Sequence, residues 1–352
     1  EVFDNNTESW VIMPNAFEVI MISFYGCTDS LALNYDPLAT VDDSSCTYPM
    51  TYVSDDNFEQ ALINLGYDNM LDDSVLTANI IAVTYLDVSS QNIADLTGIE
   101  GFSDLTELWC GSNSLTSLDV SANTALTWLY CNDNSLTSLD VSQNTSLVNL
   151  VCNSNQLTSL DVSQNTSLSV LSFWDFSSGQ ITNIDLSNNT ALTYLRCEGH
   201  QLTSLDLSNN TLLRKLYCDA NLLTTLDLSA NADLTHVSCP DNQLTSLDLS
   251  DLNLVYWINV HTNPFTSLDL RNGNNINASL LASNCPNLFC IDVDNPVYST
   301  ANWSQVDPWA SFSSNCATAF GCTDSLASNY NPLATIDDAS CYYLPAPDFQ
   351  CV

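Results

Sequence analysis

The chain has 352 residues, with 41 Asp and Glu against four Lys and Arg, for a formal net charge of −37. This charge excludes nucleic acid and anionic membranes as partners and favours cations, although solubility alone explains it equally well. Hydrophobic residues make up 45% of the chain, which excludes a disordered polyanion and allows a sizeable core. No apolar run reaches the roughly 20 residues of a membrane span, so we expect no membrane insertion.

Residues 1–25 are expected to form a strand segment outside any domain. The stretch Val11–Tyr25 is apolar in patches, but Pro14, Asn15 and Glu18 interrupt it. It also lacks the basic start of a signal peptide. Two strands, or the end of a longer protein, therefore explain it better than a leader does.

Residues 26–48 and 317–343 contain two copies of one small cysteine module. The string from Gly26 to Cys46 returns almost unchanged from Gly321 to Cys341. In both copies the two cysteines lie 19 residues apart, which predicts the disulfides Cys27–Cys46 and Cys322–Cys341. A module this small has little core, so each bridge is expected to contribute about 3 kcal/mol through loop entropy.

The acidic residues of the modules suggest a bound ion. The string resembles a short Asp- and Asn-rich module of Bacteroidota surface proteins and, more distantly, thrombospondin type 3 repeats, which bind Ca²⁺. The resemblance implies calcium ligands at Asp29, Asn34, Asp36, Asp42, Asp43, Asp324, Asn329, Asn331, Asp337 and Asp338. The alternative is that these residues form turns and helix caps, because the 12-residue spacing of an EF-hand is absent. Both interpretations stay open.

Residues 51–105 are expected to cap one end of a repeat array. Acidic N-cap candidates, apolar residues at Phe58, Leu62 and Leu65, and a stop at Gly66 predict a short helix from Ser54 to Gly66. The following residues, 84–100, already have a degenerate repeat pattern. This segment therefore starts the array and covers its first core residues.

Residues 106–275 repeat with a period of 21. The first residue of the string Leu-Thr-Ser-Leu-Asp or its variants recurs at Leu115, Leu136, Leu157, Ile181, Leu202, Leu223, Leu244 and Phe265, and only the gap from Leu157 to Ile181 is 24. Each unit matches L-x-x-L-x-C-x-x-N-x-L, the leucine-rich-repeat signature. The pattern predicts a mainly β solenoid of stacked parallel strands, with a short α-helical N-terminal cap and small disulfide-stapled modules at both ends.

Two columns of Asn predict where each coil turns. One follows the Cys-containing strand, and the other recurs in the second half of the unit, at Asn123, Asn144, Asn165, Asn189, Asn210 and Asn231. Two turns per unit indicate two strand-like sides. A third column, at Cys110, Cys131, Cys152, Cys197, Cys218 and Cys239, points inward and is occupied elsewhere by Phe173 and Val260. These cysteines are therefore predicted to be free buried thiols.

The outward residues differ between the two sides. The second side repeats Asp119, Asp140, Asp161, Asp185, Asp206, Asp227, Asp248 and Asp269, either a calcium-loading strip or, as we favour, a hydrogen-bonded polar strip. The Cys-containing strand varies and holds aromatic and basic residues. The candidate binding residues are Trp109, Trp128, Tyr130, Trp174, Tyr194, Arg196, Lys215, Tyr217, His236 and Trp257. Exposed Trp, Tyr and Arg are typical of binding hot spots, although strands favour aromatic residues in any case.

The capping segment resembles the N-terminal cap of internalin-type leucine-rich-repeat proteins, through its helix and the string I-x-D-L-T-G-I-E ending at Glu100. The 21-residue units resemble secreted leucine-rich-repeat proteins of Bacteroidota, and residues 276–316 resemble their C-terminal cap. That resemblance implies a disulfide Cys290–Cys316, and the two cysteines left over, Cys285 and Cys351, would then pair with each other. It also implies O-glycosylation at Ser30, Ser74 and Ser325 and export by type IX secretion. Residues 344–352 form a tail.

No motif of an enzyme is present. The three His residues lack metal-ligand spacing, and we find no nucleophile motif or phosphate loop. We therefore expect a non-enzymatic adhesion or recognition protein outside the cell or on its surface, with a surface protein or a glycan as its partner and calcium as its cofactor. The alternative is a structural subunit of a surface filament or layer, joined to copies of itself through the terminal modules.

Overall fold

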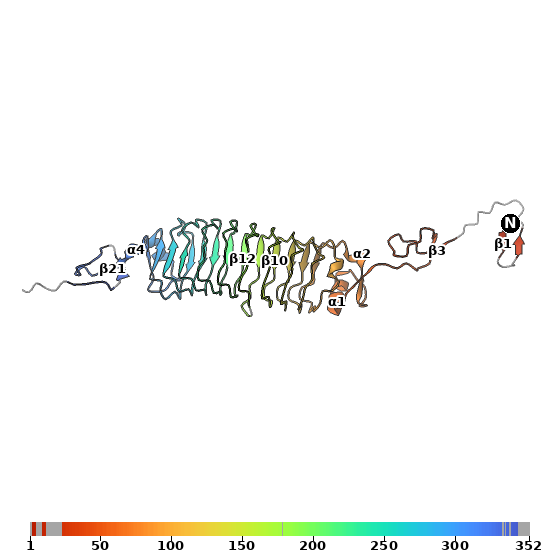
Figure 1. The fold of residues 1–352 in the computed structure, drawn as a ribbon, viewed down its shortest axis with the longest axis horizontal. Helices are drawn as coiled ribbons and strands as arrows, with labels where there is room; N and C mark the ends of the chain where they lie inside the picture. Colours follow the sequence, from red (N-terminus) through yellow and green to blue (C-terminus); the bar gives the residue numbers. More distant parts are fainter. Residues whose placement is uncertain are drawn as a thin grey trace, which may run out of the picture. The chain divides into compact units, whose positions relative to one another are not determined.

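The computed structural model describes residues 2–4, 9–11, 23–177, 179–332, 334, 336–337 and 339–343, the first two ranges by their backbone alone. The chain divides into two compact units, Glu1–Met50 and Thr51–Val352. Figure 1 traces the elements of both in chain order.

The first unit contains two short pairs of strands. β1 (Val2–Asp4) and β2 (Ser9–Val11) are antiparallel, and β3 (Tyr25–Gly26) and β4 (Val41–Asp42) are parallel. The predicted bridge Cys27–Cys46 is present and joins the start and the end of the first module. Most of the stretch from Val11 to Tyr25, where strands are predicted, lies outside the described residues.

The second unit begins with the predicted cap. β5 (Met50–Tyr52) and β6 (Ser74–Leu76) form a two-stranded sheet around α1 (Asp56–Leu65), followed by α2 (Thr77–Ile80) and a 3-10 turn η1 (Ile99–Gly101). The Asp55 side chain caps α1 by accepting hydrogen bonds from the backbone N–H groups of Asn57 and Phe58. Gly66 ends α1 in the left-handed conformation. The helix predicted from Ser54 to Gly66 is confirmed.

A ten-stranded parallel sheet forms one side of the solenoid, and Figure 1 shows its strands stacked side by side. Each three-residue strand pairs in register with the strands of the neighbouring coils, and the middle residue points into the core. The strands are β7 (Tyr85–Asp87), β8 (Glu107–Trp109), β9 (Trp128–Tyr130), β10 (Asn149–Val151), β11 (Val170–Ser172), β12 (Tyr194–Arg196), β13 (Lys215–Tyr217), β14 (His236–Ser238), β16 (Trp257–Asn259) and β18 (Ser279–Leu281).

The second side of the solenoid differs from the prediction of a continuous strand-like side. In the described residues a parallel sheet forms there only at the C-terminal end, from β15 (Ser246–Asp248), β17 (Ser267–Leu270), β19 (Cys290–Val293) and β20 (Ser311–Ser313). In earlier coils the Asp of each unit accepts a hydrogen bond from the backbone two residues later, as in Asp119 with Ser121 (2.9 Å). The same turn follows Asp248 in β15 and Asp269 in β17, so it is compatible with strand pairing as well.

The core consists of the predicted inward columns. The Leu residues of successive coils are buried together with the cysteine column and with Phe173 and Val260. The six cysteines of that column are fully or almost fully buried and free, as predicted. Burial raises the pKa of the Cys131 thiol to about 12, so these sulfurs stay protonated and unreactive.

Both Asn columns bond one coil to the next. The Asn134 side-chain amide donates to the carbonyl oxygens of Cys110 and Cys131, and its oxygen accepts from the Leu115 N–H (3.0 Å). The Asn144 amide donates to the carbonyl oxygens of Val120 and Asn123, both at 2.9 Å. The Asn134 amide therefore pairs the Cys110 and Cys131 carbonyls, whereas the Asn144 amide adds a second hydrogen bond to carbonyls that also accept from the Asn123 and Leu126 N–H groups.

The C-terminal cap of the solenoid contains α3 (Pro296–Asn302), α4 (Cys316–Ala319) and the implied disulfide Cys290–Cys316. The pairing of Cys285 with Cys351 is wrong, because the Cys285 thiol is free and fully buried at the position that Asn occupies in earlier coils. Cys351 itself lies outside the described residues. The second module contains β21 (Phe320–Gly321), β22 (Ile336–Asp337) and the predicted bridge Cys322–Cys341. No helix in the described residues is long and apolar enough to cross a membrane.

Candidate binding face

The outward side chains of β8 to β16, together with Trp174 in the turn after β11, form what we call the aromatic face. Because the middle residue of each strand is buried, its two neighbours point outward on the same surface. The ten residues predicted for binding all lie on this surface, and none is fully buried. Nine are half-buried against one another, and Trp128 is exposed.

A first aromatic cluster covers β7, β8 and β9. The Trp109 ring contacts Tyr85 on one side and Tyr130 on the other, with ring centroids 5.9 and 5.0 Å apart. Trp128 adds a further contact to Tyr130 at 6.1 Å. These rings support one another at close range, so they lose little conformational freedom when a partner binds.

A second aromatic cluster covers β12 to β16. Tyr217 lies between Tyr194 (5.8 Å) and Trp257 (6.0 Å), and His236 contacts both Trp257 and Tyr256. Partial burial, with the Lys215 ammonium nearby, lowers the pKa of His236 and favours the neutral imidazole. The two clusters are separated by β10 and β11, whose outward residues are the smaller Asn149, Val151, Val170 and Ser172.

Arg196 lies at the inner edge of the second cluster, next to the irregular coil. Its guanidinium lies 5.5 Å from the ring centroids of both Trp174 and Tyr217. It also donates two hydrogen bonds, at 2.9 and 2.7 Å, to one carboxylate oxygen of Glu198. The stacked rings and the carboxylate hold the guanidinium in one position, as a partner-binding Arg requires.

A group of buried titratable residues lies beside Arg196, and sequence reasoning missed it. Glu198 and His200 are almost fully buried, and Asp219 lies at the position of Glu198 in the next coil. Burial raises the pKa of both Glu198 and Asp219 and lowers that of His200. Two features of the sequence could have revealed this group. His200 replaces the Asn found at this position in most units, and an acidic residue directly follows the column cysteine in two successive units.

The three extra residues of the long coil form a bulge at this place. A side chain at Gly199 would put its Cβ 2.3 Å from the Asp175 carbonyl oxygen, and one at Gly179 would lie 2.0 Å from the Gly199 carbonyl oxygen. The His200 ring replaces the Asn amide and contacts the Phe173 carbonyl oxygen through Nε2 at 2.5 Å. The bulge, and Trp174 with it, therefore depends on two glycines and a histidine.

The residues predicted to bind calcium in the modules form turns in the structure. Asp29, Asp36, Asp42 and Asp43 each accept a hydrogen bond from the backbone N–H two residues later. Asn34 bridges to Ser45 and Thr47, and in the second module Asn329 makes the matching bonds to Ser340 and Tyr342. Asp324 and Asp337 repeat the turns, whereas Asp338 lies outside the described residues.

Tyrosine side chains complete both modules in the same way. Tyr48 donates to Asp29 at 2.8 Å, and Tyr343 donates to Asp324 at 2.5 Å. Most of the predicted ligands therefore already serve a structural role, and calcium binding by the modules stays a prediction. Of the predicted glycosylation sites, Ser30 and Ser325 are exposed, whereas Ser74 is half-buried in β6 and bonds Asp72.

The geometry of the aromatic face suits binding rather than catalysis. Its Arg196 is held by aromatic rings and by Glu198, and the cysteines beneath it are buried and protonated. Aromatic side chains and a positioned Arg provide large contact areas that lose little side-chain entropy. Three disulfides indicate a protein that works outside a reducing cytoplasm.

Comparison with known proteins places the fold among leucine-rich-repeat solenoids, although no family model matches the sequence. Internalin J of Listeria monocytogenes is 37% identical over 70 residues, which are 20% of this chain and 8% of that protein. The solved functional domain of InlJ, which includes a cysteine ladder, has a TM-score of 0.54 and 29% identity, with 75% of this chain and 70% of that chain covered.

Two further solved structures show the same fold at lower identity. An internalin (inlF) from Listeria monocytogenes has a TM-score of 0.60 at 18% identity, covering 74% of this chain and 77% of its own. The ectodomain of the receptor kinase GASSHO1/SCHENGEN3 from Arabidopsis thaliana, in complex with CASPARIAN STRIP INTEGRITY FACTOR 2, has a TM-score of 0.51 at 22% identity, covering 62% of this chain and 28% of its own. The chain thus has an internalin-like leucine-rich-repeat solenoid fold, which is typical of proteins that bind other molecules.

Proposed function

We propose that the chain is a non-enzymatic, extracellular recognition protein that binds a protein on a cell surface through its aromatic face. The observation that carries the proposal is the contrast between the two sides of the solenoid. One side repeats the same Thr and Asp in all eight units, with Ser between them in six, whereas the outward residues of the ten-stranded sheet change from coil to coil. A side with the same residues in every coil would bind a partner equally well at any position along the solenoid. Only the side whose residues differ between coils can select one partner at one position.

The distribution of contacts favours a protein over a glycan as the partner. The two aromatic clusters lie on either side of smaller residues on β10 and β11, so a partner that contacts both must span four or more coils. At a strand spacing of about 4.8 Å this exceeds the width of a single sugar. Arg196 provides a charge-specific contact between the two clusters. Export by type IX secretion and calcium binding by the modules belong to the same proposal.

Binding of the labelled chain to a panel of bacterial and animal cells tests the proposal. Tyr217→Ala removes the centre of the second cluster and is expected to weaken binding by about 2 kcal/mol, or about thirtyfold. Thr158→Ala, at an exposed position on the second side, is the control and should bind like the native chain. Treating the cells with protease should abolish binding, and periodate should leave it intact.

The opposite pattern would change the conclusion. Loss of binding after periodate alone would identify a glycan as the partner. Equal binding by both variants would exclude the aromatic face. A glycan array, run with and without Ca²⁺, would then identify the sugar.

A second candidate function is a structural subunit of a surface filament or layer. The specific observation is that both modules expose the same apolar side chain, with Leu31 76% exposed and Leu326 84% exposed at equivalent positions. Contacts between modules of neighbouring copies would bury them. Electron microscopy of the purified chain distinguishes the candidates, because ordered fibres favour the filament and monodisperse particles favour recognition.

A further inference from the structure

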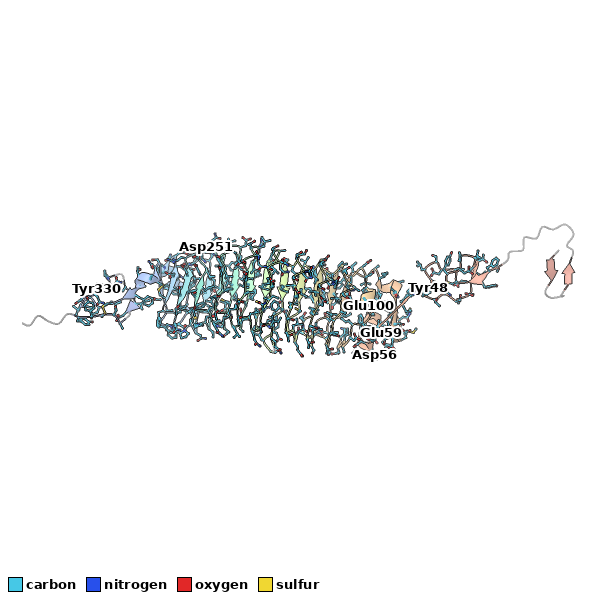
Figure 2. The ribbon with its side chains drawn as sticks, viewed as in Figure 1. Tyr48, Asp56, Glu59, Glu100, Asp251 and Tyr330 are labelled. Carbon is cyan, nitrogen blue, oxygen red and sulfur yellow. A yellow bond between two sulfur atoms is a disulfide. The ribbon has the colours of Figure 1, made fainter. Side chains whose placement is uncertain are left out.

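Five acidic residues gather where the cap begins, around α1 and the loop that leads to β6. They are Asp56, Glu59, Asp68, Asp72 and Asp73. The sequence offers them no basic partner, because the first Lys, Arg or His of the chain is Arg196. Figure 2 shows Asp56 and Glu59 close together on α1. This concentration of negative charge therefore needs a counter-ion from solution.

Glu59 is the member that the fold buries. Its side chain is 1% exposed although it lies on a surface helix. One carboxylate oxygen accepts hydrogen bonds from the backbone N–H groups of Asp72 (2.8 Å) and Ser74 (3.1 Å). The other oxygen, Oε2, is buried and has no hydrogen-bond partner among the described residues. A buried carboxylate oxygen without a partner destabilises the fold, unless a cation binds it.

Asp68 presents a second orphan oxygen to the same place. Its Oδ2 is buried and has no hydrogen-bond partner in the described part of the chain. Burial, together with the charges of Glu59 and Asp72, raises the pKa of Asp68. Oxygens of Glu59, Asp68 and Asp72 all lie within 4.8 Å of one another, as do oxygens of Asp56, Glu59 and Asp73. Three carboxylates at such separations repel one another until a cation joins them.

We propose that a calcium ion binds between Glu59, Asp68 and Asp72 and joins α1 to the loop before β6. The ligands are all oxygens, without His or Cys, which favours a hard cation over zinc or copper. Two carboxylates come from a loop whose backbone is already bonded to Glu59, so the ion adds to an existing contact. Ca²⁺ accepts such irregular ligand sets, whereas Mg²⁺ requires near-octahedral geometry. Asp56 and Asp73 form a second group with Glu59, and we assign the ion to the group of Asp68 because that residue contributes a second buried oxygen without a partner among the described residues.

The variant Glu59→Gln removes the negative charge that would bind the ion but keeps the hydrogen bonds through which Glu59 supports the fold. The amide oxygen keeps the two backbone hydrogen bonds, and the amide NH₂ replaces the orphan oxygen as a donor toward Asp68. The variant is therefore expected to fold, to be at least as stable as the native chain in EDTA, and to lose one calcium site. Asp68→Asn should weaken the site at least tenfold, whereas Asp56→Asn, the matched control, should leave it nearly unchanged.

Calorimetric titration of the full chain with CaCl₂ and hydrogen exchange at the Asp72 and Ser74 amides measure the outcome. Sites of this class have dissociation constants of about 0.1–1 mM, so about 10 mM Ca²⁺ should slow exchange at both amides in the native chain. Exchange in Glu59→Gln should not respond to Ca²⁺. If native and Glu59→Gln chains bind equal numbers of ions, the cap site is refuted. If Asp56→Asn loses the ion and Asp68→Asn keeps it, the assigned ligands are wrong.

The test is independent of the partner and of the modules. Calcium bound by the modules would remain in Glu59→Gln, so it adds the same number of ions to both chains. Cell binding through the aromatic face is measured separately, and its failure would leave the cap site untouched.

Discussion

At the residue scale, the irregular coil shows how a single position controls the placement of a binding residue. Gly199 adopts φ +74° and lies against the Asp175 carbonyl, so that Trp174 and Arg196 meet at the edge of the bulge. The bulge coincides with the 24-residue gap in the repeat, and Gly179 and Gly199 are the residues that permit it.

Gly199→Ala is expected to destabilise the solenoid by about 3 kcal/mol, because the new Cβ overlaps a backbone oxygen and the backbone angle disfavours any side chain. Gly66→Ala is the control, since Gly66 has a similar φ of +82° but no atom within 4 Å of an added Cβ. It should cost only about 1 kcal/mol. Urea unfolding of both variants measures the difference, and equal losses would show that crowding in the bulge is unimportant.

At the element scale, the coil is held by side-chain amides as much as by strand pairing. Every Asn of the second-half column donates two hydrogen bonds to backbone carbonyls of the preceding coil, while its own oxygen stays buried without a partner among the described residues. The amide hydrogens therefore explain why Asn recurs at this position.

Asn144→Ala is expected to lower the free energy of unfolding by about 1–3 kcal/mol, because the Val120 and Asn123 carbonyls each lose one of their two donors. Gln143→Ala changes the exposed neighbour and should lie within about 0.5 kcal/mol of the native chain. Denaturant unfolding followed by circular dichroism measures both. A loss in Asn144→Ala no larger than in the control would contradict a structural role for the column.

The elements also show how far the sequence alone could lead. The strand of each coil, the inward cysteines, the cap helix and the disulfides Cys27–Cys46 and Cys322–Cys341 follow from spacing, because period and spacing are what a solenoid repeats. The lack of strands over most of the second side does not follow, because the repeated sequence and its Asp turn are the same in coils with strands and in coils without them, as at Asp248 and Asp119. The buried Glu59 and Glu198 were also missed, since acidic residues in an acidic chain give no local signal.

At the scale of the whole molecule, the cysteine column links stability to pH. Each ladder thiol has a raised pKa in the fold, about 12 for Cys131 against 9.0 for an ordinary thiol, because burial disfavours the thiolate. The unfolded chain releases these protons near pH 9, and the folded chain holds them. The contribution to stability is therefore complete below pH 9 and is lost as pH rises from 9 through about 12.

The unfolding free energy of Cys131→Val should fall less steeply with pH than that of the native chain. The slopes should differ by about 1.4 kcal/mol per pH unit between pH 9 and 12. Valine suits the site, because Val260 occupies the same column in a later coil. Unfolding free energies measured from pH 7 to 11 test the effect. Parallel pH profiles for the native and variant chains would show that Cys131 does not contribute.

The coexistence of free and bridged sulfurs in one chain has a consequence for how the protein matures. A newly made chain in an oxidising compartment carries every cysteine within reach of the oxidant, and neighbouring sulfurs one coil apart would readily cross-link in the wrong pairs. Winding of the coils has to outpace oxidation. Once the next coil covers a coil, the sulfur of that coil is buried and no longer reacts with the oxidant. Only the cysteines near the two ends of the chain then stay accessible and form disulfides.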